Sequence, residues 1–194
     1  MIWYSSTVET PAGPFTIVAT DDAVLASGWT MDVGALTVLV HPSLRPTTVP
    51  QPRAELGTVT KAVLSYLDGD LVAVDGVPVS QRGGEFLDDA WRVLRAVAPG
   101  APVSYTELAT RAGRPRAVRA AAQACARNPA ALFVPCHRVL RADATLGGFR
   151  WGVPVKRWLL DHEASPADRD ADHGADSAAG PAAENRWESR SRGR

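Results

Sequence analysis

The sequence predicts an α+β protein whose first half is rich in strands and whose second half is mostly helical. Short apolar runs separated by turn signals fill residues 1–50, whereas apolar residues recur at helical spacing between residues 85 and 163. The segment after residue 163 has almost no large apolar side chain, so it cannot bury enough surface to offset its ordering entropy. We therefore expect an α/β domain over 1–84, a mostly helical domain over 85–163 and a disordered tail over 164–194.

The first domain is expected to combine strands with one helix. Residues 15–19 and 23–26 are apolar runs with a turn signal between them, and the Pro- and Thr-rich residues 42–52 predict a loop. The spacing of large apolar residues predicts a helix over 53–67. Apolar runs within 71–79 predict a further strand or an edge pair. No residue pattern in this half indicates chemistry.

The second domain opens with an apolar helical stripe over 86–97, which a Pro-Gly pair ends. Ser104 and Glu107 then form a capping-box pattern, with Ser104 at the N-cap of a short helix. Gly113 is placed to adopt the left-handed conformation that ends this helix.

Pro115 suits the first turn of a second helix, predicted over 116–127. A short helix, a glycine-containing turn and a second helix form the helix-turn-helix pattern. The second helix is almost entirely alanine, with arginine at 116, 119 and 127. Such a slim basic face suits close approach to a DNA backbone or entry into a narrow groove. The alternative is that alanine is simply the best helix former and lets helices pack closely.

The net charge is zero, but the charges are unevenly distributed along the chain. Residues 1–99 carry six Lys/Arg and eleven Asp/Glu, whereas residues 100–158 carry ten Lys/Arg and two acidic residues. A basic segment indicates an anionic partner, unless it forms an ordinary solvated face. Because this segment coincides with the helix-turn-helix pattern, we favour DNA as the partner.

Composition excludes several classes of protein. No apolar run has the length of a membrane span and the N-terminus lacks a signal-peptide pattern, so we expect a cytoplasmic protein without a membrane partner. Two cysteines and four scattered histidines give neither a disulfide framework nor the spacing of a zinc site. We expect no metal and no cofactor.

A Pro-Cys-His-Arg block lies between apolar residues within 132–140. A cysteine attacks as its thiolate, and His137 together with nearby arginines is what would lower the pKa of Cys136. The alternative is a buried structural cysteine, and these residues alone leave both interpretations open.

The segment after this block contains a glycine-rich stretch and a final helix. Glycines within 146–152 would let the backbone approach a flat ligand, although two adjacent glycines are a weak signal. The helix is predicted over 154–163, with Lys156 and Arg157 on its exposed side. Glu163 lies at its end, where it is placed to orient a histidine.

Six stretches of the second domain match one family pattern in order and spacing. This pattern resembles the O6-alkylguanine-DNA alkyltransferase (methylated-DNA–protein-cysteine methyltransferase) family, strongly over 85–163 and weakly over 1–84. The resemblance implies a small ribonuclease-H-like α/β domain, followed by a helix-turn-helix, winged-helix-like domain that binds DNA and holds the catalytic residues. The matching stretches are 103–105, 112–120, 127–129, 134–139, 147–152 and 156–160.

The resemblance implies direct repair of DNA by a methylated-DNA–protein-cysteine S-methyltransferase that acts once. The alkyl group of O6-alkylguanine, and also that of O4-methylthymine, would pass irreversibly to Cys136. His137 would be the base, acting through a water held in part by Asn128, and Glu163 would hold His137 in the useful tautomer. Tyr105 would donate a proton or hydrogen bond to guanine N3.

The resemblance also implies how DNA is bound. Arg119 would replace the flipped nucleotide in the base stack while the alanine-rich helix enters the minor groove, with little sequence preference. The Val139 carbonyl and the Arg150 amide would read the flipped base, and Phe149 would line its pocket. The expected partner is double-stranded DNA carrying O6-alkylguanine, bound by a monomer. Further DNA contacts are expected from Arg116, Ser104 and Ala120.

Two positions depart from the family pattern. Position 149 is often tyrosine, and Phe149 has no hydroxyl. Cys125 lies on the second helix near the pocket wall, either as inert lining or as a second alkylatable thiol. Two other classes of function stay open: a DNA-lesion binder, which would lack a reactive cysteine, and a cysteine hydrolase, which would turn over.

Overall fold

The computed structural model describes residues 2–164, so the predicted tail over 164–194 lies almost wholly outside the described residues. Contacts group residues 1–163 into one compact unit. Within the described part of the chain, no helix is both long and apolar enough to cross a membrane.

A four-stranded sheet occupies the first half of the chain, in the spatial order β3-β2-β1-β4. The strands are β1 (Tyr4–Thr10), β2 (Gly13–Ala19), β3 (Val24–Gly28) and the short β4 (Gln51–Pro52). The first three pair antiparallel, and β4 pairs parallel to β1. Gly13 has a φ of +105°, which allows the tight turn between β1 and β2.

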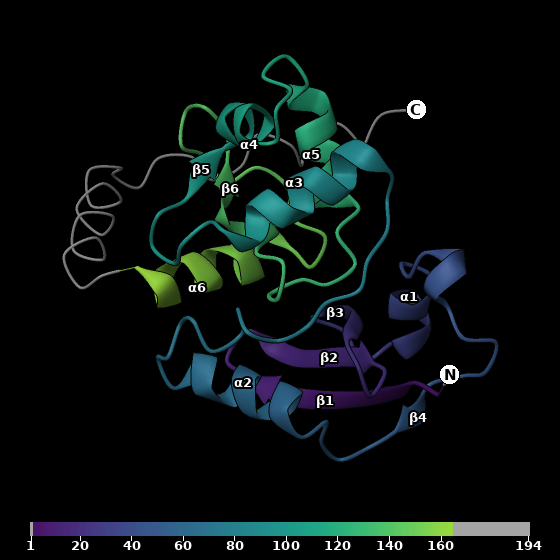
Figure 1. Ribbon diagram of the computed structural model, residues 1–194. Helices are drawn as coiled ribbons and strands as arrows, with labels where there is room; N and C mark the ends of the chain where they lie inside the picture. Colours follow the sequence, from purple (N-terminus) through teal and green to yellow (C-terminus); the bar gives the residue numbers. More distant parts are fainter. Residues whose placement is uncertain (1, 165–194) are drawn as a thin grey trace, which may run out of the picture. The chain divides into compact units, whose positions relative to one another are not determined.

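Two helices belong to this half: α1 (Val33–Thr37) and α2 (Thr58–Leu67). Helix α2 lies along the sheet beside β1 (Figure 1). The expected helix over 53–67 is therefore confirmed in its second part, whereas α1 was not predicted. The expected loop over 42–52 also contains a single 3-10 turn, η1 (Pro42–Leu44), and β4.

The strand expected within 71–79 is wrong. This stretch forms consecutive turns, with backbone bonds such as Val77 N to Val74 O, and only Val79 makes a bridge, to Val24. Val74 and Val77 are buried while Val72 is exposed. Valine is enriched in strands, so the valine-rich composition of this stretch predicted a strand, but the three-residue spacing of the buried valines reflects turns.

The second half is mostly helical, as predicted (Figure 1). A two-stranded parallel sheet pairs β5 (Val103–Ser104) with β6 (Val139–Leu140). The Pro-Cys-His-Arg block contributes the 3-10 turn η2 (Cys136–Arg138), directly before β6. The helices are α3 (Glu85–Arg95), α4 (Tyr105–Arg111), α5 (Val118–Ala126) and α6 (Val153–Glu163).

Local capping explains how the two short helices α4 and α5 form. The Ser104 hydroxyl accepts a hydrogen bond from Glu107 N at 3.1 Å, and Gly113 has a φ of +78°, so both predicted ends of α4 are confirmed. Helix α5 begins later than predicted, because Pro115 and Arg116 lie in a turn closed by the Arg114 carbonyl and Ala117 N.

One hydrophobic core joins the two halves of the chain. It contains Phe15 and Tyr66 from the first half and Leu94 and Phe133 from the second. Strand β3 also binds the second half directly, because the Ser27 hydroxyl donates to the Ala131 carbonyl at 2.7 Å. The boundary predicted between residues 84 and 85 stays a prediction, and the segment that leads to Cys136 rests on the N-terminal sheet.

Candidate active site

Cys136 is buried in η2, and its sulfur is held by the side chain of Asn128. The Asn128 amide nitrogen lies 3.1 Å from Cys136 Sγ and donates to the Val134 carbonyl at 2.7 Å. The Asn128 carbonyl oxygen accepts from Ala130 N at 3.1 Å. Asn128 thus fixes both the backbone before the cysteine and the sulfur itself. Asn128, which was expected to help hold a water for His137, contacts the Cys136 sulfur directly, and its role toward a water stays a prediction.

His137 and Glu163 meet in the interior, at 2.9 Å between His137 Nε2 and Glu163 Oε1. Both side chains are completely shielded from solvent. An ionised carboxylate only accepts hydrogen bonds, so this contact assigns the proton of a neutral imidazole to Nε2. His137 Nδ1 is buried and has no hydrogen-bond partner among the described residues.

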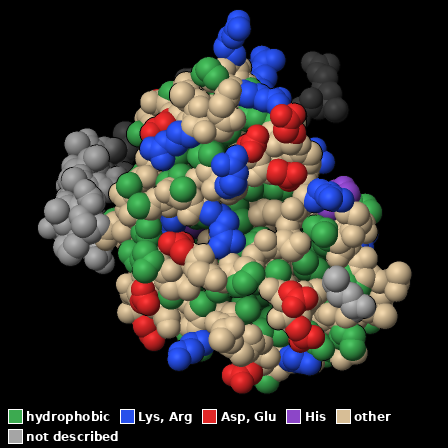
Figure 2. All heavy atoms as spheres, in the orientation of Figure 1, with side chains coloured by type: hydrophobic (Ala, Val, Ile, Leu, Met, Phe, Trp, Pro, Cys, Tyr) green, Lys and Arg blue, Asp and Glu red, His purple; other side chains and the backbone are tan. Residues whose placement is uncertain are grey.

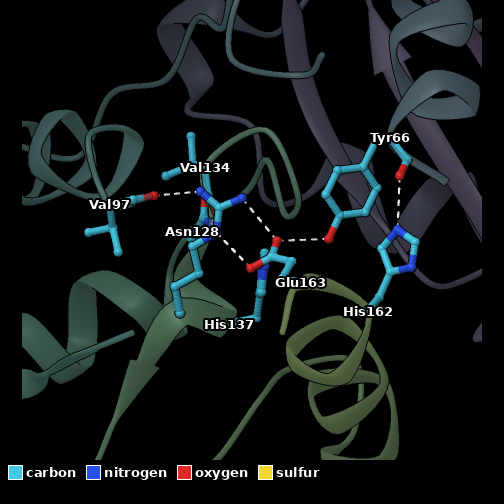
Figure 3. A network of polar contacts seen from close by, with 8 residues as sticks. Tyr66, Val97, Asn128, Val134, His137, His162 and Glu163 are labelled. Carbon is cyan, nitrogen blue, oxygen red and sulfur yellow. Dashed lines mark hydrogen bonds and ion pairs between the residues drawn. The ribbon is translucent and has the colours of Figure 1, made fainter. Parts of the chain in front are cut away.

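Glu163 has two further partners that the sequence did not reveal (Figure 3). Arg138 donates through Nε to Oε2 and through Nη2 to Oε1, each at 2.9 Å, and through Nη1 to the Val97 carbonyl. The Tyr66 hydroxyl donates to Oε1 at 2.8 Å. Arg138 could have been suspected from its place beside His137, but no sequence signal connects Tyr66 to Glu163.

The protonation states follow from burial and from these partners. Burial alone would raise the pKa of Glu163, but the facing His137 and the hydrogen bonds from His137 and Arg138 outweigh it and lower that pKa to about 2. Burial lowers the pKa of His137, against the opposing effect of Glu163. At neutral pH the pair is therefore a carboxylate and a neutral imidazole, whose Nδ1 can accept a proton.

Neighbouring basic groups act on the pKa of Cys136 in the expected direction, but they do not determine it in the free protein. Burial raises the pKa of this thiol, and the hydrogen bond from Asn128 and the charges of Lys156 and Arg150 oppose the rise without cancelling it. The His137 ring is bound to Glu163 through Nε2. A nucleophilic Cys136 therefore needs a base that removes its proton during the reaction.

A cavity of about 530 Å³ opens beside Cys136. It brings together α4, α5, η2 and the glycine-rich stretch, which are far apart in the sequence. Three predicted site residues, Tyr105, Phe149 and Arg150, line it together with Cys136. The full lining is Tyr105, Ala122, Cys125, Ala126, Cys136, Gly148, Phe149 and Arg150.

Lys156 is not on the exposed side of its helix, contrary to the prediction. It is fully buried, and its ammonium group donates to the carbonyls of Val139, at 2.6 Å, and Leu146. The buried face of α6 consists of Lys156, Leu159 and Glu163, which are spaced three and four residues apart. Val139 itself is buried in β6 and does not line the cavity, although its carbonyl was expected to read a base.

The residues predicted to bind DNA lie on or beside α4 and α5. Arg116 and Arg119 are exposed, whereas Ser104 and Ala120 are partly buried. Lys and Arg side chains gather in the upper part of Figure 2, where Figure 1 places α4 and α5. Further exposed arginines of this half are Arg92, Arg111, Arg114, Arg127, Arg141, Arg150 and Arg157.

Cys125 lies in the same cavity as Cys136, and both thiols are free. Burial raises the pKa of Cys125, so its resting form is the thiol. Among the described residues, no group of three or more His, Cys, Asp or Glu side chains is arranged to hold a metal ion.

Comparison with known proteins identifies the family. A family model described as 6-O-methylguanine DNA methyltransferase, DNA binding domain, matches residues 85–165. The Escherichia coli bifunctional transcriptional activator/DNA repair enzyme Ada is 48% identical over 93 residues, which are 48% of this chain and 26% of Ada. The chain thus spans about a quarter of the length of that relative.

A second relative matches along almost its whole length. The methylated-DNA–protein-cysteine methyltransferase of Mycobacterium bovis is 36% identical over 170 residues, which are 88% of this chain and 97% of that protein. The chain belongs to the methylated-DNA–protein-cysteine methyltransferase family. The crystal structure of the Mycobacterium tuberculosis family member in complex with DNA has a TM-score of 0.66 at 27% identity, and the match covers 82% of this chain and 92% of the other.

The family assignment confirms the resemblance inferred from the sequence, and the shared architecture confirms the predicted α+β class. The segment matched by the family model contains Cys136, His137, Arg138 and Glu163. Tyr66 lies outside this segment, although its hydroxyl contacts the same carboxylate.

Proposed function

We propose that this methyltransferase-family chain repairs DNA by transferring the alkyl group of O6-alkylguanine to Cys136, once and irreversibly. The observation that carries the proposal is the position of Cys136. Cys136 lines a cavity of about 530 Å³, and the next residue in the chain, His137, is paired with Glu163 in the interior. A nucleophile, a neutral base and an orienting carboxylate are the parts that acyl and alkyl transfer to cysteine require.

Alkyl transfer would need Cys136, His137, Tyr105 and one water, and no other reactant. A bond forms between Cys136 Sγ and the alkyl carbon as the bond from that carbon to guanine O6 breaks. The thiol proton passes through a bridging water to His137 Nδ1, the buried acceptor that has no partner among the described residues. The departing guanine takes a proton at N3 from Tyr105, and His137 later returns one to the tyrosine. The thioether is stable, so the chain acts once.

Substrate recognition is proposed to use the cavity walls. Phe149 offers an apolar face to the base, while the backbone amide of Arg150 binds its edge. Ala122 and Ala126 contribute small side chains where α5 borders the cavity, and this leaves room for a flat ring. The Arg150 side chain donates to the Ala126 carbonyl at 2.7 Å and so closes the wall between α5 and the glycine-rich stretch.

DNA is proposed to bind along α4 and α5. The exposed arginines supply a basic surface, and the DNA complex of the M. tuberculosis relative supports DNA as the partner. The protein would bind as a monomer, and its alanine-rich α5 would enter the minor groove. Arg119 would take the place of the flipped nucleotide. Further DNA contacts would come from Arg116, Ser104 and Ala120. O4-methylthymine is proposed as a second substrate.

Intact-protein mass spectrometry tests this function. The chain is incubated with a duplex that carries one O6-methylguanine, beside Cys136→Ser and Cys125→Ser variants. We expect one added methyl group, mapped to Cys136, in wild type and Cys125→Ser and none in Cys136→Ser. Tight binding to the duplex without any adduct would instead support a lesion binder, and an adduct on Cys125 would overturn the assignment of the acceptor.

A further inference from the structure

The two oxygens of Glu163 are not equivalent. Oε1 receives hydrogen bonds from His137 Nε2 at 2.9 Å, Arg138 Nη2 at 2.9 Å and the Tyr66 hydroxyl at 2.8 Å, whereas Oε2 receives the Arg138 Nε bond. Tyr66 lies on α2, 97 residues before Glu163, and it is fully buried. Figure 3 shows the hydroxyl of Tyr66 pointing at the Glu163 carboxylate, which lies next to His137.

Resting on the proposed function, we propose that Tyr66 is a positioning residue for alkyl transfer: its hydroxyl holds Glu163 Oε1 against His137 and keeps the imidazole neutral, with its proton on Nε2. The N-terminal half would then contribute to the chemistry as well as to the core. The hydroxyl is a permanent donor, because burial and the nearby Glu163 raise the pKa of Tyr66.

Each donor to the carboxylate has a separate effect. Arg138 binds both oxygens and fixes the plane of the carboxylate. Tyr66 adds a donor to the one oxygen that faces His137, which spreads the negative charge and weakens the attraction of Glu163 for a protonated imidazole. With Tyr66 in place, His137 is oriented by the carboxylate and remains free to accept a proton at Nδ1.

The ring of Tyr66 is held independently of its hydroxyl. The His162 ring packs against it with centroids 5.1 Å apart, and His162 Nε2 lies 2.8 Å from the Tyr66 carbonyl oxygen. Removing the hydroxyl alone, in Tyr66→Phe, therefore preserves these contacts. The titratable and charged groups that surround His137 and Tyr66 come from three elements: Tyr66 of α2, Cys136 and Arg138 of η2, and Lys156, His162 and Glu163 of α6.

The pH profile of alkyl transfer separates positioning from mere packing. In Tyr66→Phe, Glu163 Oε1 loses a donor, so His137 is protonated more readily and is lost as a base at a higher pH. We expect the acid-side inflection of the transfer rate to move upward by about one pH unit. The rate would then fall several-fold more at about pH 6 than at about pH 8.5. A tyrosine that only packs would change the rate by one factor at every pH.

The experiment measures single-turnover methyl transfer from an O6-methylguanine duplex between about pH 5.5 and pH 9. Wild type, Tyr66→Phe and the matched control Tyr4→Phe are compared. Tyr4 is a second buried tyrosine of the first half, and its ring packs against Arg53 at 3.4 Å from the ring centre. A rate constant per active chain is insensitive to a loss of folded protein. An unmoved inflection in Tyr66→Phe, or an equal shift in Tyr4→Phe, would overturn the proposal.

A second measurement does not depend on alkyl transfer. The imidazole nitrogens of His137 are followed by nitrogen-15 NMR across the same pH range in the free protein. We expect the Nε2-protonated tautomer in wild type and a higher titration midpoint in Tyr66→Phe, and an unchanged midpoint would overturn the proposal. A wild-type chain that accepts no methyl group would refute the proposed function, while the titration would still decide whether Tyr66 controls His137.

Discussion

At the scale of single residues, the Glu163 carboxylate joins Tyr66 of the first half of the chain to the adjacent residues His137 and Arg138 of the second. It is buried, with Arg138 as an ionic partner and with hydrogen bonds from Tyr66 and His137. A buried ion pair contributes little by itself, but removal of one partner leaves a charge without compensation in the interior. The site and the stability of the fold therefore depend on the same carboxylate.

The low pKa of Glu163 makes stability depend on pH. This pKa is about 2 in the folded chain, below its ordinary value near 4.3 in the unfolded chain, so the unfolded state binds more protons between these values. Ionised Glu163 therefore contributes roughly 3 kcal/mol to the free energy of unfolding. This contribution is complete above about pH 5 and is lost as the pH falls toward about 2. Urea unfolding of wild type, measured at several pH values between about 2.5 and 7, should show this loss.

Glu163→Gln removes the titrating group, so its unfolding free energy should change less over the acid range. At neutral pH this variant should be less stable by about 3–5 kcal/mol, because Arg138 keeps its buried charge. The matched control is Glu107→Gln, which disrupts an exposed pair with Arg111 and should cost at most about 1 kcal/mol. If the free energy of unfolding fell equally with decreasing pH in wild type and in Glu163→Gln, the assigned protonation state of Glu163 would be contradicted.

At the scale of elements, strand β3 positions the glycine-rich stretch of the cavity wall. A Cβ atom built on Gly28 would lie 2.0 Å from the ring of Trp151, so the indole occupies space that only glycine leaves free. Next to Gly28, Trp29 packs against Phe149 with ring centroids 6.2 Å apart. The N-terminal sheet thus packs against the glycine-rich stretch and supports the cavity wall that this stretch forms.

Gly28→Ala should displace Trp151 and, with it, the wall formed by Phe149 and Arg150. We expect a loss of stability of about 1–3 kcal/mol and a rate of methyl transfer lowered by about tenfold or more. Gly76→Ala is the control, because no atom lies within 4 Å of a Cβ built there. Thermal unfolding and single-turnover rates measure both effects, and an unchanged rate in Gly28→Ala would show that β3 does not position the wall.

Helix α5 offers the second prediction at this scale. Arg119 is exposed on α5 and is proposed to fill the space left by the flipped nucleotide. Arg119→Ala should slow repair in duplex DNA by about a hundredfold, since extrusion of a base costs a few kcal/mol, and should leave transfer from free O6-alkylguanine base nearly unchanged. The exposed Lys61 of α2 supplies the control Lys61→Ala, which removes one charge elsewhere. Equal losses of rate on duplex DNA and on the free base would contradict a role of Arg119 in base flipping.

At the scale of the whole molecule, the uneven charge distribution governs DNA binding. The first 99 residues are acidic and the basic residues cluster in the second half, so phosphate contacts would come from the α4–α5 surface. Affinity for duplex DNA should fall steeply with salt and vary little with sequence. Fluorescence anisotropy over a salt series, on several unrelated duplexes, measures both. A strong preference for one sequence would contradict minor-groove binding through an alanine-rich helix.

The features that the sequence predicted are those set by neighbouring residues. The caps at Ser104 and Gly113 act within one helical turn, and Cys136 and His137 are adjacent, so a local pattern sufficed. Asn128 and Glu163 were assigned by resemblance, and the structure brings both to the Cys-His pair.

The features that the sequence did not predict depend on tertiary contacts. Tyr66 reaches Glu163 across 97 residues, and nothing in the pattern of α2 separates it from an ordinary core tyrosine. Lys156 is buried because two carbonyls bind its ammonium group, whereas a helical pattern places lysine outside. Residues 71–79 are rich in valine, which favours strands, but backbone bonds between residues three apart fold this stretch into turns that bury Val74 and Val77.

The most direct test of the central claim is the stoichiometry of methyl transfer to the wild-type chain. The chain is mixed with a large excess of O6-methylguanine duplex, and the repaired guanine is counted against the active protein over time. Our account predicts a plateau at one methyl group per chain, because the thioether at Cys136 does not turn over. Repair that continues beyond one equivalent would establish a hydrolase, and binding without any repair would establish a lesion binder; either result would contradict the account.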